Sequence, residues 1–178
     1  MAAVSPFALL QQYDQRCRAN ARGLPSGEIV EDDWVGIGFT LNGKPLLARM
    51  SDVTEILPPP DTIRVPGVKS WVNGIANVRG TLMPILDMKA FLSGKPTLRK
   101  KDSRVLVINK QNVLAGLLVE EVSGMRRFKP DMKQQDVLPQ MGELEPFLDG
   151  VFSDAQVQWS VFSMEKLVTN DRFLKVIE

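Results

Sequence analysis

The first 33 residues combine a helical pattern with an acidic connector. Apolar residues recur at intervals of three and four over residues 5–22, which predicts a helix with one apolar stripe. The stripe comprises Phe7, Leu10, Tyr13, Cys17 and Ala21. Ser5 suits the N-cap and Pro6 the first helical position, and residues 23–33 then form a solvated acidic connector. We expect the stripe either to pack on the rest of the chain or to bind a partner, and both interpretations stay open.

From residue 34 the pattern changes to the two-residue alternation of β-strands. Residues 34–41 predict one strand, and Asn42-Gly43 is a strong signal for a tight hairpin turn. The return strand follows over residues 44–50. Apolar spacing over residues 51–57 then predicts one helical turn.

A later segment repeats the hairpin. Residues 105–108 and 113–119 predict two strands around a turn at 109–112. Neither unit has enough strands to bury its apolar face alone. We therefore expect two related β units that pack on each other within one domain over residues 34–178.

Residues 75–86 predict a third hairpin, whose turn carries candidate chemistry. Gly80 permits the positive φ of a tight turn, and Arg79 beside it presents a fork of hydrogen-bond donors from a rigid tip. Arg79 either pairs with a nearby carboxylate such as Asp87, and so holds the turn, or contacts a partner. The residues alone leave both interpretations open.

The remaining segments have weaker patterns. They predict a helical segment over 68–72 capped by Asn73-Gly74, a basic loop over 93–104, an irregular region over 129–146, strands over 147–152 and 157–162, and a final helix. Ser163 is the expected cap of that helix, whose apolar side carries Leu167, Leu174 and Ile177.

Composition excludes the common routes to catalysis. The chain of 178 residues has no histidine and one cysteine, so it lacks a histidine base, a catalytic triad with histidine and the ligands of the usual zinc sites. Adjacent carboxylates such as Glu120 and Glu121 point to opposite sides of a strand. Two carboxylates from different segments could converge in space, as in a glycosidase, but nothing in their spacing suggests it. We therefore expect no enzyme, no catalytic residue, no metal site and no cofactor.

The amino-terminal region has no targeting pattern. Its longest uncharged stretch, residues 1–13, contains Pro6, Gln11 and Gln12 and follows no basic segment. This predicts neither a signal peptide nor a membrane span. We expect a cytoplasmic protein with no direct membrane insertion.

Two basic runs suggest an acidic partner or RNA. Both can equally be ordinary solvated surface that binds no partner. They are Lys95–Arg104 and Arg126–Lys129. The whole chain balances 22 basic against 21 acidic residues, and its aromatic residues form no spaced stacking platform. We expect no nucleic-acid partner, with a small β-barrel RNA-binding protein as the alternative from another functional class.

The segment from Val65 to Asp87 carries a family resemblance. It reads VPGVKSWVNGIANVRGTLMPILD and resembles the signature of the CheW family of chemotaxis coupling proteins, G-[IV]-x-N-[LV]-R-G-x-x-x-P-[IV]-x-D. Shorter similarities at Val53–Ile56, Ala115–Val122, Phe147–Gly150 and Met164–Leu167 extend the resemblance over about residues 34–170. Glu120 and Glu121 depart from the Asp and Gly that the family often has there.

The resemblance implies a fold and a function without catalysis. The implied fold is mainly β, with two intertwined five-stranded SH3-like barrels, to which this chain adds an N-terminal helix and a C-terminal helix. The implied function is an adaptor between the cytoplasmic tip of a methyl-accepting chemoreceptor and the regulatory domain of a CheA-type histidine kinase. The start of the chain is most similar to the family members of twitching-motility systems, which control type IV pili. A scaffold of a flagellar or other chemosensory array is the alternative.

The resemblance also implies where partners bind and where the protein resides. Candidates for the receptor- or kinase-binding groove and its rim are Val53, Glu55, Ile56, Asn77, Arg79, Gly80, Leu118 and Val119. Gly74, Pro84 and Asp87 are expected in structural turns. An apolar groove between the barrels would receive the helical receptor tip. Recruitment to membrane receptor clusters or to the cell pole follows from such a partner.

Overall fold

The structure is a computed structural model that describes residues 6–20, 33–135, 140–154 and 157–177. The chain divides into two compact units, Met1–Glu31 and Asp32–Glu178. The first unit contains α1 (Pro6–Asn20), which confirms the predicted amino-terminal helix. Within this unit Phe7, Leu10 and Tyr13 are exposed. The expected connector lies outside the described residues up to position 32.

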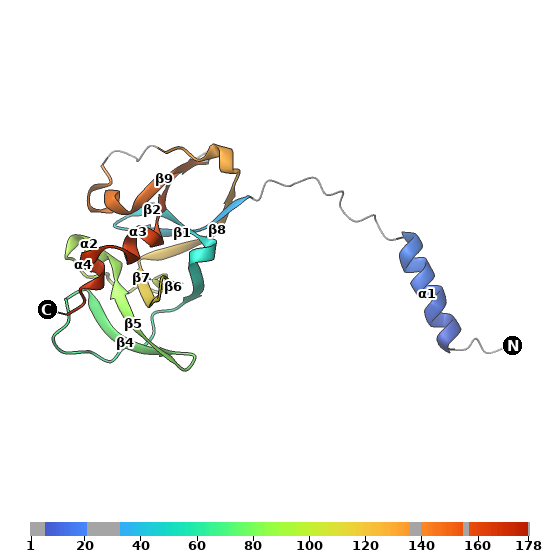
Figure 1. Cartoon of the computed structure of the whole chain (residues 1–178), viewed down its shortest axis with the longest axis horizontal. Coiled ribbons are helices and arrows are strands. Elements are labelled where there is room, and N and C mark those ends of the chain that lie inside the picture. Colours follow the sequence, from blue (N-terminus) through green and yellow to red (C-terminus); the bar gives the residue numbers. More distant parts are fainter. Residues whose placement is uncertain (1–5, 21–32, 136–139, 155–156, 178) are drawn as a thin grey trace. The chain divides into compact units, whose positions relative to one another are not determined.

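The second unit consists of two five-stranded sheets (Figure 1). The first has the order β8-β1-β2-β10-β9 and the second the order β3-β6-β7-β5-β4. The first sheet comprises β1 (Trp34–Leu41), β2 (Lys44–Arg49), β8 (Glu121–Phe128), β9 (Leu148–Ser153) and β10 (Gln158–Phe162). The second comprises β3 (Val53–Leu57), β4 (Val72–Val78), β5 (Thr81–Asp87), β6 (Arg104–Lys110) and β7 (Val113–Val119).

The two sheets are intertwined along the chain and repeat one another. The first sheet takes two strands from before the second sheet and three from after it. Each sheet contains one parallel pair, β2 with β10 and β5 with β7, and antiparallel pairs otherwise. A short helix follows the equivalent strands β5 and β10, namely α2 (Met88–Ser93) and α3 (Met164–Val168). These correspondences confirm the two related β units.

In each sheet, one isolated β-bridge joins the two edges, and the two bridges are equivalent. In the second sheet, Ile63 follows edge strand β3 and exchanges two backbone hydrogen bonds with Ile75 on edge strand β4, at 2.8 and 2.9 Å. In the first sheet, Gln134 follows β8 and does the same with Val151 on β9, at 2.9 and 2.8 Å. Each sheet thus curls onto its own edge, and we call the two sheets the first barrel and the second barrel.

Three apolar clusters hold the barrels. The largest draws residues from both sheets, for example Leu46 from β2 and Leu106 from β6, and forms the shared core. Smaller clusters around Phe152 and Leu118 fill the first and second barrels respectively. Both faces of the central strands are covered. Their sequences are therefore continuous apolar runs rather than an alternation of apolar and polar residues.

Three predicted helical segments differ from the structure. Residues 53–57 form strand β3, because β6 supplies backbone partners, and only Met50–Asp52 make a 3₁₀ turn, η1. Residues 68–71 form turns and an isolated bridge, and Val72 begins β4. The final helix is broken into α3 and α4 (Asp171–Leu174), because Asn170 caps the second piece. Consequently the expected apolar side is lost, and Leu174 and Ile177 are exposed.

The rest of the carboxyl-terminal half agrees with expectation. Ser163 caps α3 by accepting a hydrogen bond from the backbone N–H of Lys166. Residues 129–146 contain no strand where they are described, and two 3₁₀ turns, η2 (Pro130–Met132) and η3 (Gly142–Phe147), lie in or at the end of this region.

Candidate partner-binding site

The hairpin between β4 and β5 ends in a turn of fixed geometry. Val78 pairs with Thr81, so Arg79 and Gly80 alone form the turn, with φ of 51° and 87°. Two positive φ values match the turn to the twist of the flanking strands. The side-chain Oδ1 of Asn77 accepts the N–H of Gly80 at 2.8 Å. The Asn-x-Arg-Gly sequence therefore builds a rigid tip, in which Asn77 and Gly80 hold the position of Arg79.

Arg79 pairs with Glu55 and not with Asp87, which the sequence suggested as one possible partner. Its Nη2 lies 2.7 Å from Oε1 of Glu55 on β3. The side chain of Arg79 is 81% exposed and that of Glu55 is 28% exposed. This ion pair leaves donors of the guanidinium facing solvent, where a partner's acceptors can reach them.

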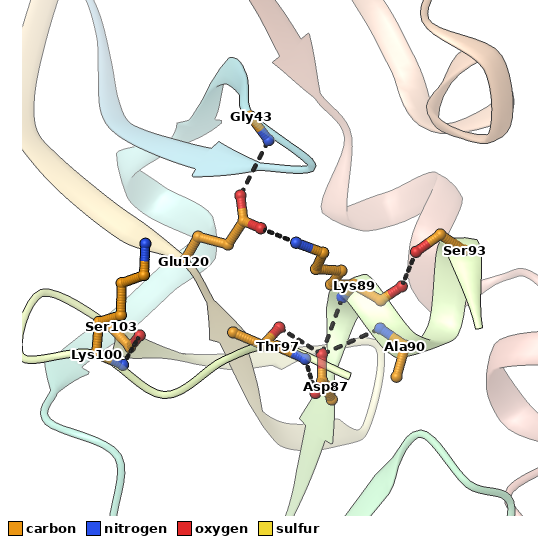
Figure 2. Close-up of polar contacts among 9 residues, drawn as sticks. All are labelled: Gly43, Asp87, Lys89, Ala90, Ser93, Thr97, Lys100, Ser103 and Glu120. Carbon is orange, nitrogen blue, oxygen red and sulfur yellow. Dashed lines mark hydrogen bonds and ion pairs between the residues drawn. The ribbon is translucent and has the colours of Figure 1, made fainter. Parts of the chain in front are cut away.

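Asp87 has a structural task at the end of β5. Its buried carboxylate accepts hydrogen bonds from the backbone N–H groups of Lys89 and Ala90, both at 3.1 Å, and so caps α2 (Figure 2). It also accepts from the N–H and Oγ1 of Thr97, at 2.7 and 2.6 Å. These contacts fix both the helix and the loop that follows it, and they place Asp87 away from any partner surface.

Gly74 and Pro84 lie inside strands, which corrects their assignment to turns. Gly74 has a φ of 133° in β4, and a Cβ there would lie 2.3 Å from the carbonyl oxygen of Ile63. Glycine is therefore required by the bridge that closes the second barrel. Pro84 lies in β5 opposite Ile75.

The outer face of the hairpin exposes apolar side chains that the sequence analysis missed. Ile75 pairs with Pro84 and with Ile63, and Asn77 pairs with Leu82, so these side chains share one face. The exposed fractions are 79% for Ile63, 38% for Ile75 and 70% for Leu82. The alternation of exposed and buried positions in β4 was the available signal. We define the hairpin surface as Glu55, Ile63, Ile75, Asn77, Arg79 and Leu82.

Two candidate contact residues lie in the core. Leu118 and Val119 on β7 are 1% and 0% exposed. Leu118 packs inside the second barrel with Ala76 and Met83, beneath the hairpin, and Val119 belongs to the shared core. Both shape the surface from within and offer no side chain to a partner, which corrects their place in a groove. Ile56 on β3 is 40% exposed and is available for contact.

A second exposed apolar region lies where the two barrels meet. Met125 on β8 pairs with Ile37, which pairs with Ala48, so this row shares the face of the first sheet that contributes to the shared core. Met125 is 51% exposed at the outer end of the row. Met50, 49% exposed, begins the η1 link between the sheets, and half-buried Val53 follows it. We define the junction surface as Met50, Val53 and Met125.

Glu120 connects the barrels next to a pocket of about 430 Å³. Its carboxylate accepts the N–H of Gly43 from the β1–β2 turn at 3.0 Å and the Nζ of Lys89 from α2 at 2.5 Å (Figure 2). Burial raises the pKa of Glu120, but the hydrogen bonds from Lys89 and Gly43 and the charges of Lys89 and Lys100 outweigh it, so the pKa lies below the ordinary value of 4.5. Glu120 thus serves as a charged clamp between the barrels.

The described residues show neither a metal cluster nor a membrane helix. No group of three or more candidate ligands in the described part of the chain could hold a metal ion. Over the same residues, none of the helices has the length and hydropathy needed to cross a bilayer.

Comparisons with known proteins agree on one family. Residues 35–172 match the family model described as CheW-like domain. Protein PilI of Pseudomonas aeruginosa is 44% identical over 172 residues, which cover 97% of this chain and 96% of PilI. Chemotaxis protein CheW of Bacillus subtilis is 25% identical over 143 residues, which cover 80% and 81% of the two chains.

The fold has a solved counterpart. The crystal structure of scaffolding protein TtCheW from Thermoanaerobacter tengcongensis superimposes with a TM-score of 0.68, covering 79% of this chain and 95% of that chain at 18% identity. This confirms the expected fold class.

Proposed function

Since the chain belongs to the CheW-like domain family, we propose that it is a non-catalytic adaptor that couples a methyl-accepting chemoreceptor to a CheA-type histidine kinase. The near full-length similarity to PilI supports a role in the chemosensory system of type IV pilus twitching motility. The names of the other relatives, a chemotaxis protein and a scaffolding protein, support coupling rather than chemistry. The observation that carries the proposal is the exposed Arg79 on its rigid turn, bordered by exposed apolar side chains.

The hairpin surface is the proposed kinase-binding site. Ile75 and Leu82 supply apolar area, and Arg79 supplies charge-assisted hydrogen bonds at the edge of that area. Because Asn77 fixes the turn in advance, little conformational entropy is lost when the partner binds. Arginine is among the residues that most often contribute a large share of the binding free energy at an interface.

The junction surface is the proposed receptor-binding site. A helical receptor tip presents apolar residues at spacings of three and four, which dock into an apolar groove between elements. Met50 and Met125 suit this task because the unbranched thioether side chain adapts to differently shaped partners. The two surfaces comprise different residues, which allows the protein to hold receptor and kinase at the same time.

Weak individual contacts are sufficient for this function. A micromolar contact corresponds to about −8 kcal/mol, and clustered receptors raise the effective concentration of the kinase. We place the protein in the cytoplasm, recruited to receptor clusters or to the cell pole. The adaptor changes kinase output only if its contact free energy differs between the two states of the complex.

Isothermal titration of the full chain tests the assignment of the two surfaces. The titrants are the regulatory domain of the cognate kinase and a receptor signalling fragment. We expect Arg79→Ala to weaken kinase binding by about tenfold or more and Met125→Glu to weaken receptor binding similarly. Each variant is the matched control for the other partner. Wild-type affinity of both variants for both partners would contradict the assignment.

A further inference from the structure

Residues 94–104, which comprise the loop between α2 and β6 and the first residue of β6, concentrate positive charge on a nearly neutral chain. It carries five cationic side chains, Lys95, Arg99, Lys100, Lys101 and Arg104, against the single carboxylate of Asp102. The chain as a whole has a net charge of only +1. This concentration creates a local positive potential that the overall composition hides.

Two buried anchors hold the loop in place. Thr97 is 7% exposed and donates from both its N–H and its Oγ1 to Asp87, and Ser103 is 0% exposed (Figure 2). The Oγ of Ser103 accepts the N–H of Lys100 at 3.0 Å, and the N–H of Ser103 donates to the carbonyl of Lys100 at 3.1 Å. The cations between the anchors are therefore presented from a fixed backbone rather than from a solvated coil.

Three of the cations form no ion pair within the described part of the chain. Arg104 donates to the carbonyls of Lys101 and Ser103, and Lys100 lines the pocket that contains Glu120. Within the described residues, the ammonium of Lys95, the guanidinium of Arg99 and the ammonium of Lys101 have no carboxylate at ion-pair distance. Their charge remains available to a partner.

An exposed leucine lies among these cations. Leu98 is 76% exposed and directly follows the buried anchor Thr97, so its position is fixed while its side chain faces solvent. A polar rim around an apolar anchor is typical of a protein interface. Glu120, Glu121 and Asp102 border the same pocket as Leu98 and would repel negative groups there. A closely spaced row of phosphates could not avoid this repulsion, whereas an acidic segment that places an apolar side chain at Leu98 could.

This region is separate from the hairpin surface. The loop lies beyond α2 at the Asp87 end of β5, whereas the turn of Arg79 lies at the Thr81 end. Seven residues of strand separate the two ends by about 20 Å. One partner segment of ordinary size therefore need not cover both.

We propose that the anchored loop, residues 94–104, is a further interaction surface that binds an acidic protein segment carrying an apolar side chain. Lys95, Arg99 and Lys101 pair with the acidic side chains, and Leu98 contacts the apolar one. Charge complementarity speeds association and selects the partner, and the anchors reduce the entropy lost on binding. The surface is additional to the two proposed adaptor contacts and does not depend on them.

Fluorescence anisotropy with the full chain tests this proposal. The probe is a labelled peptide that alternates glutamate and leucine, compared with the same peptide carrying glutamine for glutamate. The loop variant is Lys95→Gln with Arg99→Gln and Lys101→Gln. The charge-matched control is Arg64→Gln with Lys129→Gln and Lys175→Gln, all exposed and outside the loop.

We expect the acidic peptide to bind the wild-type chain and the control variant within about twofold of each other, and the loop variant about tenfold more weakly. Leu98→Ser is expected to weaken binding about threefold without changing its salt dependence, because it removes only apolar contact. Equal losses in both triple variants would overturn the proposal, since binding would then follow net charge. Tighter binding of oligouridylate RNA or of anionic vesicles than of the acidic peptide would overturn it also.

Discussion

Arg79 is held by one ion pair and is otherwise exposed, so its removal is expected to affect binding far more than folding. Exposed ion pairs contribute about 0–1 kcal/mol to stability. We therefore predict that Arg79→Ala lowers the melting temperature by no more than about 3 °C. Glu55→Ala is the control, because it breaks the same ion pair and should lower the melting temperature by a similar amount. A loss of more than about 8 °C in a thermal melt would contradict the view that Arg79 is primarily a contact residue.

Asp87 is expected to show the opposite behaviour. Asp87→Ala leaves the N–H groups of Lys89, Ala90 and Thr97 without their acceptor in a buried setting. Losses of this kind cost about 3 kcal/mol or more in the free energy of unfolding. The exposed carboxylate of Asp102 offers a control, since its alanine variant should change stability by less than about 0.5 kcal/mol. Urea unfolding followed by tryptophan fluorescence measures both, and equal effects would argue against the capping role.

Glu120 gives a prediction for the pH dependence of stability. Its pKa in the folded state lies below 4.5, so the folded state binds fewer protons than the unfolded state as the pH falls through this range. The stabilisation is thus complete above about pH 4.5 and is lost as the pH falls through the lowered pKa. We predict that wild type exceeds Glu120→Gln in stability at pH 7 and that the difference shrinks below about pH 4.5.

Urea unfolding of both proteins at a series of pH values measures this difference. Glu121→Gln serves as control, because that neighbouring side chain is exposed and forms no ion pair within the described residues. A difference between wild type and Glu120→Gln that stays constant from neutral to acidic pH would refute the charged clamp.

At the scale of elements, the two bridges that close the barrels make equivalent demands on the chain. Gly74 and Gly150 have φ of 133° and 104°, and a Cβ at either site would lie 2.3 or 2.4 Å from a backbone carbonyl oxygen of the bridging segment. We predict that Gly74→Ala and Gly150→Ala each destabilise the protein by about 3 kcal/mol, through backbone strain and the clash together. Gly67 has a φ of 69° with open space around it, so Gly67→Ala should cost about 1 kcal/mol. Equal costs at all three glycines in chemical denaturation would show that the bridges do not matter.

Elements defined by local chemistry were predictable, and those defined by distant partners were not. Asn42-Gly43 and Arg79-Gly80 specify their turns through positive φ, so both hairpins are found where the sequence predicts them. Residues 51–57 are ambiguous because apolar positions in so short a run fit either period. The pairing of β3 with β6, some 50 positions away in the chain, decides the matter.

At the scale of the whole molecule, the candidate site was predictable as a motif but not as a surface. The Arg-Gly tip is local, whereas its partner Glu55 lies on a strand that the long-range fold brings near. Leu118 and Val119 are buried because β7 is central in its sheet, a fact that no neighbouring residue reveals. Exposure of Ile63 and Leu82 likewise follows from the curl of the second barrel.

The core clusters also predict the behaviour of a shortened chain. Among the residues that the structure describes, those that make up the three clusters all lie between positions 34 and 176. We therefore expect residues 34–178 to fold on their own, with a cooperative thermal transition close to that of the full chain. A large fall in melting temperature would instead favour packing of the apolar stripe of α1 on the rest of the protein. An unchanged melt with lost partner binding would identify the stripe as a docking surface.

The central claim is that this protein joins a kinase to a receptor by contacting each through a different surface. Co-sedimentation tests it most directly, with a receptor signalling fragment displayed on vesicles, the soluble cognate kinase and the full chain. We predict that the kinase sediments with the vesicles only when the chain is present, and that Arg79→Ala leaves the chain on the vesicles but the kinase in solution. Equal sedimentation of the kinase with and without the chain would contradict the claim.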